Sequence, residues 1–149
     1  MSTANRLAAK ESVTRLILAY CSEIDAGRLD GMAELFSKGT WYPSPRTPLK
    51  GRDQVAAFLN TNVILYDGVP RTRHVTTNIR VDLAEDGKSA SAESYMIIYQ
   101  SAPGSGPQII VQGAYADKFF LDDGQWFFDE RHVTTDGMGD TSNHIRARG

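Results

Sequence analysis

The sequence has little cysteine, little proline and no long apolar run. Its 149 residues include six prolines and a single cysteine, Cys21, which cannot form a disulfide within the chain. The longest apolar runs fall well short of the roughly 20 residues that cross a bilayer. The N-terminal MSTANRLAAKES also lacks the continuous apolar stretch of a signal peptide. We therefore expect a cytoplasmic protein without disulfides and without a membrane partner.

An excess of charge of one sign is missing as well. Sixteen Lys and Arg residues against eighteen Asp and Glu residues give a net charge of −2. This balance provides no basic field of the kind that attracts nucleic acid. The hydrophobic share of 41% is typical of a globular chain. At this length we expect one domain spanning residues 1–149, with an ordered core at 5–135 and a mobile polar tail at 136–149.

Apolar residues at helical spacing occupy the first part of the chain, and β-rich runs separated by glycine-containing turns occupy the rest. The spacing predicts helices over residues 5–25, 30–36 and 53–60. We expect Gly27 to end the first helix, and Asp30 and Asp53 to cap the other two. The later runs predict strands at 72–83, 89–100, 108–121 and 125–134, after a short strand at 40–42.

Helices followed by strands indicate an α+β fold rather than an alternating α/β fold. The predicted strands of ten or more residues exceed the usual length of about five or six. Such strands favour a strongly curved, mixed but mostly antiparallel sheet that wraps around the helices. A helix in the hollow of that sheet leaves a conical cavity at one end, where we expect a small molecule to bind.

Two polar residues near the end of the first helix are candidates for this cavity. Tyr20 and Asp25 are five residues apart, so both side chains can point toward one space. The helix dipole disfavours a carboxylate at a helix C-terminus, which makes an incidental placement of Asp25 less favourable. The alternative is a carboxylate that only binds backbone groups at the helix end.

His74 opens the first long strand and is the candidate base. A pocket carboxylate such as Asp25 would fix its tautomer and its orientation. The alternative is a structural histidine with no part in chemistry. Strict alternation would put His74 on the face opposite Ile79, so we expect a β-bulge near Thr76 and Thr77 that returns both side chains to one face.

Arg131 in the last strand shares an alternation face with apolar residues. A buried guanidinium is costly without an anionic partner or a ligand, so Arg131 is a third candidate for the cavity. The structural alternative is an ion pair with one of three carboxylates, those of Asp25, Glu93 or Asp129.

The other two histidines are not candidates. Alternation places His132 on the outer face of the last strand, and His144 falls in the polar tail. The three histidines are widely scattered and give no metal-ligand spacing. We expect neither a metal ion nor a cofactor.

The order of elements resembles SnoaL-like proteins of the nuclear transport factor two-like superfamily over residues 5–135. Three groups of residues carry the resemblance: Tyr20…Asp25, Arg73-His74…Asn78 and Trp126…Arg131. The likeness is greatest to the branch that contains scytalone dehydratase, bile acid 7α-dehydratase and hexachlorocyclohexane dehydrochlorinase, which are cofactor-free lyases. The resemblance implies a cone-shaped, cystatin-like α+β barrel.

The resemblance also implies a reaction, a β-elimination such as loss of water from a hydroxylated cyclic or polycyclic carbonyl compound. His74 would remove the proton α to the carbonyl and Asp25 would hold the imidazole. Tyr20 and Arg131 would polarise the carbonyl or support the departing oxygen. An isomerase or aldol cyclase in the same pocket, and a non-catalytic small-molecule-binding protein, remain open alternatives.

Alternation and the family likeness together predict the lining of the pocket and the assembly of the chain. The predicted lining is Trp41, Phe58, Glu93, Tyr95, Ile97, Val111 and Tyr115. It suits a flat hydrophobic ligand of aromatic, steroid or polyketide type. Apolar residues assigned to the opposite face predict a homo-oligomer, namely Ile98, Ile110, Phe120 and Phe128. The resemblance favours a trimer over a dimer.

Overall fold

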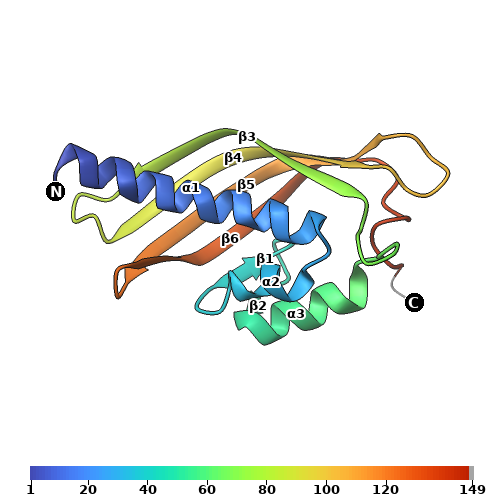
Figure 1. Cartoon of the computed structure of the whole chain (residues 1–149), viewed down its shortest axis with the longest axis horizontal. Coiled ribbons are helices and arrows are strands. Elements are labelled where there is room, and N and C mark those ends of the chain that lie inside the picture. Colours follow the sequence, from blue (N-terminus) through green and yellow to red (C-terminus); the bar gives the residue numbers. More distant parts are fainter. Residues whose placement is uncertain (148–149) are drawn as a thin grey trace.

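The computed structural model describes residues 1–147 and confirms the α+β architecture. The helices are α1 (Thr3–Asp25), α2 (Leu29–Glu34) and α3 (Gly51–Asn62). The strands are β1 (Thr40–Tyr42), β2 (Leu49–Lys50), β3 (Thr72–Leu83), β4 (Ser89–Gln100), β5 (Gln108–Asp122) and β6 (Gln125–Met138). Figure 1 shows α1 lying across the long strands, with α2 and α3 grouped beside it at one end. No helix within residues 1–147 is long and apolar enough to cross a membrane.

The six strands form one sheet in the order β2-β1-β6-β5-β4-β3. Within residues 1–147 only the β1–β6 pair of strands is parallel, and the other neighbours are antiparallel. The prediction of a mixed, mostly antiparallel sheet is therefore confirmed. The sheet is open, with β2 and β3 as its two edges, so it differs from a closed barrel. Because β3 is an edge strand, the end of α1 can reach its backbone directly.

The predicted helices and long strands are all present, with differences at their ends. β6 continues to Met138 instead of ending at residue 134, and β2 was not predicted. The predicted helix caps are wrong: Arg28 and Lys50 hold the N-cap positions, and Asp30 and Asp53 lie in the first turns of α2 and α3. A carboxylate in the first turn still interacts favourably with the helix dipole.

The predicted β-bulge in β3 is present, centred on Asn78. The register with β4 shifts between Thr77 and Arg80, and Asn78 has a φ of 54°. This left-handed conformation is one that asparagine adopts more readily than most residues. The extra residue lets His74 and Val81 both face the core although they are seven positions apart. The bulge therefore turns the His74 ring toward α1.

Gly27 ends α1, as predicted, and also allows a close approach of another loop. Its φ is 76°, and a Cβ at this position would lie 1.8 Å from the carbonyl oxygen of Gly68. Only a residue without a side chain fits this contact. The loop that leads into β3 is thereby packed against the end of α1, next to Asp25.

The face of β4 that packs against the core is the opposite of the predicted one. Ser94, Met96 and Ile98 are buried, whereas Glu93 and Tyr95 are exposed and Ile97 is half-buried on the outer face. Glu93, Tyr95 and Ile97 therefore do not line an inner pocket, and that prediction is wrong. β4 carries apolar residues on both faces, so its alternation did not indicate which face is inside.

The residues predicted for the outer face are also partly misplaced. Ile98, Ile110 and Phe128 belong to the hydrophobic core, and only Phe120 is outside it. For Phe128 the cause is a register shift between Lys118 and Phe119 on β5, which brings Phe128 opposite the buried Phe119. The outer face instead exposes Val75, Tyr95 and Ile109.

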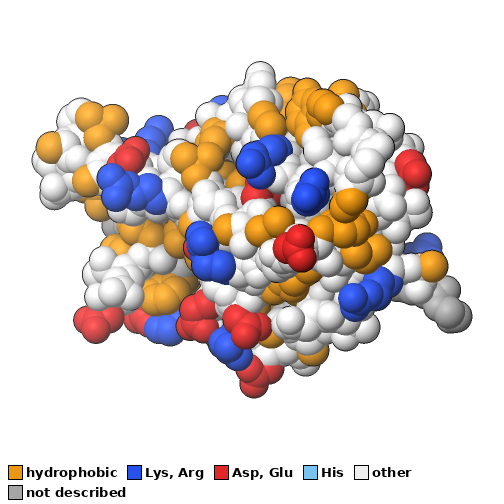
Figure 2. All heavy atoms as spheres, turned by 45° about the vertical axis from the view of Figure 1, so that its right-hand side comes forward, with side chains coloured by type: hydrophobic (Ala, Val, Ile, Leu, Met, Phe, Trp, Pro, Cys, Tyr) orange, Lys and Arg blue, Asp and Glu red, His pale blue; other side chains and the backbone are white. Residues whose placement is uncertain are grey.

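The C-terminal tail packs against the rest of the chain, contrary to prediction. Val63 forms an isolated β-bridge with Ile145, and the Arg146 amide donates a hydrogen bond to the Asn62 carbonyl. The last two residues of the predicted tail, 148 and 149, lie outside the described residues. Figure 2 brings this end of the molecule forward and shows Lys and Arg side chains interspersed with Asp and Glu, with apolar side chains between them. The tail thus closes the end of the fold where α1 stops and β3 begins.

Candidate functional site

Asp25 and His74 form a hydrogen-bonded pair where the C-terminal end of α1 meets β3. His74 Nδ1 lies 2.6 Å from Asp25 Oδ1, and the His74 backbone amide donates to Asp25 Oδ2 at 2.8 Å. Thr72 Oγ1 also donates to Asp25 Oδ1, at 2.8 Å. Three donors therefore compensate the unfavourable helix dipole at this position.

The environment of the carboxylate assigns the tautomer of the histidine. Burial raises the pKa of Asp25, but the hydrogen bonds and the charge of His74, with the hydrogen bond from Thr72, outweigh it and hold this pKa below its usual value. An ionised carboxylate accepts hydrogen bonds only, so Nδ1 of His74 carries the proton. In the neutral form of His74 the lone pair is then on Nε2, on the side of the ring away from Asp25. That nitrogen can act as a base.

Arg131 is held in a buried ion pair with Asp117. Its Nε and Nη2 atoms donate to the two carboxylate oxygens at 2.8 and 2.9 Å, and neither side chain is exposed. The three predicted partners, Asp25, Glu93 and Asp129, are therefore wrong. Asp117 lies directly opposite Arg131 on β5. Asp117 follows the buried Tyr115 by two residues, and residues two apart on a strand face the same side of the sheet. Alternation in β5 therefore offered a signal that Asp117 is buried.

Two tyrosine rings lie on the Arg131 guanidinium. The Cζ atom is 4.3 Å from the Tyr20 ring centroid and 3.8 Å from that of Tyr115. Burial alone lowers the pKa of Arg131, but the charge of Asp117 raises it above its usual value. The guanidinium therefore stays charged, and the tyrosine faces stabilise it by cation–π contact.

Tyr20 is the centre of the inner site. Its ring lies 6.3 Å from those of His74 and Trp41 and 5.6 Å from that of Tyr115, measured between centroids. Burial raises the pKa of Tyr20 to about 12, although the charge of Arg131 opposes this. Tyr20 therefore carries a neutral hydroxyl. Its ring lies between Arg131 and the Asp25–His74 pair, so the four predicted catalytic residues form one cluster.

Three buried nitrogen atoms around this cluster have no hydrogen-bond partner within residues 1–147. They are Trp41 Nε1, Arg131 Nη1 and His144 Nδ1. A buried polar group without a partner costs about 1–3 kcal/mol, so each of these atoms requires an explanation. Polar atoms of a bound molecule would satisfy them.

His144 is the residue that sequence reasoning missed. The tail places it 5% exposed against His74, with ring centroids 6.2 Å apart. Burial and the nearby His74 lower the pKa of His144 to about 4, although Asp25 opposes the shift. The polar, glycine-rich tail has no periodicity, so its sequence carried no signal for this position. His132 lies on the outer side as predicted, stacked on Tyr42.

Four of the predicted lining residues do pack on the inner side. Trp41 and Tyr115 are buried, and Phe58 and Val111 are partly buried against the core. Phe58 contacts the edge of the Trp41 ring, with centroids 5.6 Å apart. The inner surface is thus mainly aromatic, which suits a flat apolar molecule.

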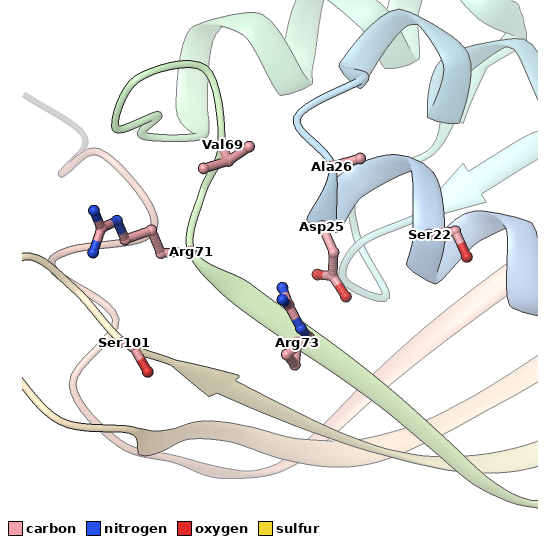
Figure 3. A pocket seen from close by; sticks show the side chains of 7 residues that line it. All are labelled: Ser22, Asp25, Ala26, Val69, Arg71, Arg73 and Ser101. Atoms are coloured by element: carbon pink, nitrogen blue, oxygen red, sulfur yellow. The ribbon is translucent and has the colours of Figure 1, made fainter.

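A cavity of about 730 Å³ opens beside Asp25, between the end of α1 and the start of β3. Its lining residues are Ser22, Asp25, Ala26, Val69, Arg71, Arg73 and Ser101. Figure 3 shows Asp25 pointing from the end of α1 toward β3, where Arg73 lies. Of the four predicted catalytic residues, only Asp25 lines this cavity. Neither His74 nor any of the residues with an unpaired buried nitrogen is among the residues that line this cavity.

No group of three or more His, Cys, Asp or Glu side chains within residues 1–147 is arranged to hold a metal ion.

A family model described as a SnoaL-like domain matches residues 5–132. The chain belongs to the SnoaL-like family. This match covers most of the chain and confirms the resemblance seen in the sequence.

Solved structures show the same fold as this SnoaL-like chain. A candidate scytalone dehydratase from Novosphingobium aromaticivorans has a TM-score of 0.75 and 24% identity, covering 93% of this chain and 91% of its own. A hexachlorocyclohexane dehydrochlorinase has a TM-score of 0.76 and 15% identity, covering 93% and 92%. ActVI-ORFA from Streptomyces coelicolor has a TM-score of 0.69 and 22% identity, covering 85% and 97%. No curated protein matches the chain. At these identities the likeness shows the fold alone.

Proposed function

We propose that this chain is a cofactor-independent lyase that catalyses β-elimination on a small hydrophobic cyclic or polycyclic substrate. The observation that carries the proposal is the 2.6 Å hydrogen bond between Asp25 and His74. It leaves Nε2 of His74 as a base whose orientation is set by a carboxylate, which is the arrangement that proton abstraction requires. The reactions named for two solved structures of this fold, a dehydratase and a dehydrochlorinase, support the same reaction class.

The proposed reaction is loss of water from a β-hydroxy carbonyl compound. Nε2 of His74 takes the proton α to the carbonyl, and the C–H electron pair moves toward the carbonyl to form an enolate. The enolate then forms the new C=C bond and releases hydroxide, which takes the proton from the His74 imidazolium and leaves as water. Asp25 stabilises the imidazolium between the two steps. His74 thereby returns to its neutral state.

Arg131 and Trp41 support the charge that develops on the substrate oxygen. The Asp117 ion pair occupies Nε and Nη2 of Arg131 and leaves Nη1 as a buried donor. Trp41 Nε1 is a second buried donor. Fixed donors in a water-poor site stabilise an enolate better than water does. Tyr20 carries a neutral hydroxyl and can add a third hydrogen bond.

A non-catalytic binding protein is the second candidate. The Arg131–Asp117 ion pair favours it, because two of the three guanidinium nitrogens serve the fold. An isomerase or a cyclase is the third candidate. The Asp25–His74 pair fits these reactions equally well, because each of them also begins with proton abstraction.

The deciding experiment is a panel of hydroxylated bicyclic and tricyclic ketones incubated with the protein and followed by mass spectrometry. A lyase releases product lighter by one water, and His74→Gln slows its release by about 10²–10⁴-fold. Isomerisation alters the absorbance or retention of the compound without altering its mass. Compounds that raise the melting temperature but return unchanged would indicate a binding protein, and would overturn the lyase proposal.

We also propose that residues 1–149 act as one cytoplasmic domain that forms a homo-oligomer, with a trimer ahead of a dimer. Val75, Tyr95 and Ile109 support the homo-oligomer, because they are 38%, 60% and 53% exposed on the outer side of the sheet. Large apolar side chains clustered on one face are typical of an interface between subunits.

A further inference from the structure

His144 occupies a defined place beside the candidate base. Its side chain is buried, and its ring meets that of His74 at an interplanar angle of 66°, with centroids 6.2 Å apart. Burial lowers the pKa of His144 to about 4. The imidazole is therefore neutral at neutral pH, with one N–H donor and one acceptor nitrogen.

Hydrogen bonds to the backbone carbonyls of Asn143 and His144 hold this position. The Ile64 amide donates to the His144 carbonyl at 2.9 Å. The carbonyl of the preceding residue, Asn143, accepts from Tyr66 Oη at 2.7 Å and from Gln100 Nε2 at 3.0 Å. The segment is thus bound to the end of β4 and to the loop before β3. These contacts place the ring without using either ring nitrogen.

The Nδ1 atom of His144 is buried and has no hydrogen-bond partner within residues 1–147. Desolvating a polar nitrogen without a partner is unfavourable by about 1–3 kcal/mol. A purely structural role would be filled better by an apolar ring of similar size, because that ring has no polar atom to desolvate. The atom is explained if a ligand supplies the missing partner.

We propose that His144 contacts the substrate by forming a hydrogen bond through Nδ1 to one of its oxygen atoms. The same substrate molecule presents its reacting carbon to Nε2 of His74. This inference rests on the proposed function for its ligand class, a hydroxylated cyclic carbonyl compound. His144 transfers no proton, because giving one up would create an imidazolate. It acts as a neutral hydrogen-bonding group, and His74 alone moves the proton. The C-terminal segment is thereby part of the binding site.

The test uses β-naphthol, a flat bicyclic phenol whose hydroxyl stands for an enol oxygen. The full-length protein with ¹⁵N-labelled histidine is titrated with β-naphthol, and the ring nitrogens of His74 and His144 are followed by NMR. The same titration gives a Kd for the wild type and for His144→Phe, which keeps an aromatic ring but removes the polar nitrogens. Asn143→Ala is the matched control, because the exposed Asn143 contributes its backbone carbonyl to docking.

The expected result is a shift of the ring nitrogens of both His74 and His144, with binding about tenfold weaker in His144→Phe and unchanged in Asn143→Ala. A shift confined to His74 overturns the inference, as does wild-type affinity in His144→Phe. Failure of the wild type to bind β-naphthol also overturns it. If His144 responds and no ketone loses water, the proposed elimination fails and the contact stands. The NMR measurement on the wild type does not depend on whether a variant folds.

Discussion

The Asp117 carboxylate binds the Arg131 guanidinium at two points, and both side chains are fully buried between β5 and β6. The ion pair fixes the guanidinium plane against the rings of Tyr20 and Tyr115. It also decides which of the three guanidinium nitrogens are already hydrogen-bonded. Two serve the ion pair and one, Nη1, has no partner among the described residues. Arg131 was predicted for catalysis, and it serves first as a structural cation whose Nη1 atom, with two N–H groups, has no partner among the described residues.

Replacing Asp117 by Asn should destabilise the fold strongly. The change leaves the Arg131 charge buried without a counter-ion, which typically costs about 3–5 kcal/mol. Urea unfolding followed by circular dichroism measures the loss. Asp123→Asn is the matched control, because Asp123 is exposed in the β5–β6 turn and should change stability by less than about 0.5 kcal/mol. Equal unfolding midpoints for Asp117→Asn and the wild type would contradict the importance of the ion pair.

Replacing His74 by Gln should reduce kcat/KM for elimination by about 10²–10⁴-fold, because the positioned base is lost. Asp25→Asn should come close to this loss, since an amide neither stabilises the imidazolium nor enforces the same tautomer. Thr72→Val removes only one of the three hydrogen bonds to Asp25 and should cost about tenfold or less. Unchanged turnover in both His74→Gln and Asp25→Asn would refute the pair as the catalytic base.

The bulge at Asn78 should tolerate Gly and reject Val. Its φ of 54° is strained for a β-branched residue, so Asn78→Val should lower the free energy of unfolding by about 1–2 kcal/mol. Asn78→Gly should remain close to the wild type, because glycine adopts this conformation freely. Both variants are measured by urea unfolding. Equal stability of the Val and Gly variants would argue against the left-handed bulge.

Acid should weaken the docking of the C-terminal segment through His144. Its folded pKa of about 4 lies below the ordinary value of 6.5, so the unfolded chain binds more protons between these values. Stability therefore falls as pH drops from 6.5 toward 4, by roughly 3 kcal/mol in all for a shift of this size. Asp25 also makes the fold less stable in acid, because its pKa is lower in the folded chain. Its contribution is lost only below its ordinary pKa of 3.8.

Comparison of the wild type with His144→Phe isolates this effect. The Phe variant cannot take up a proton at this position, so its unfolding free energy should depend less on pH between 6.5 and 4. His74 and Asp25, which face the His144 ring, are unchanged in both proteins. Parallel pH profiles for the two proteins would show that His144 is not buried in its neutral form.

The outer face of the sheet should carry the interface between subunits. Light scattering of the wild type is expected to give a mass above that of the monomer, with a trimer ahead of a dimer. Tyr95→Arg places a charge at a side chain that is 60% exposed and should shift the assembly toward the monomer. Leu18→Arg, on the exposed side of α1, is the control and should leave the mass unchanged. A monomeric wild type would contradict the proposed homo-oligomer.

The sequence by itself determined the order of helices and long strands, because hydrophobic periodicity and turn residues are local properties. It also singled out Asp25 and His74, which the structure places in hydrogen-bond contact. Tertiary structure alone decided which face of β4 is buried, since apolar residues occupy both faces of that strand. It also decided the partner of Arg131, because an ion pair between strands depends on their register.

The position of His144 depends most on tertiary structure. The tail has no periodicity of its own, and its docking relies on Tyr66 and Gln100, which lie far from it in the sequence. Such contacts form only once the β3–β4 edge and the end of α3 are in place. Local pattern therefore identified the candidate base, and only the folded chain showed which side chain faces it.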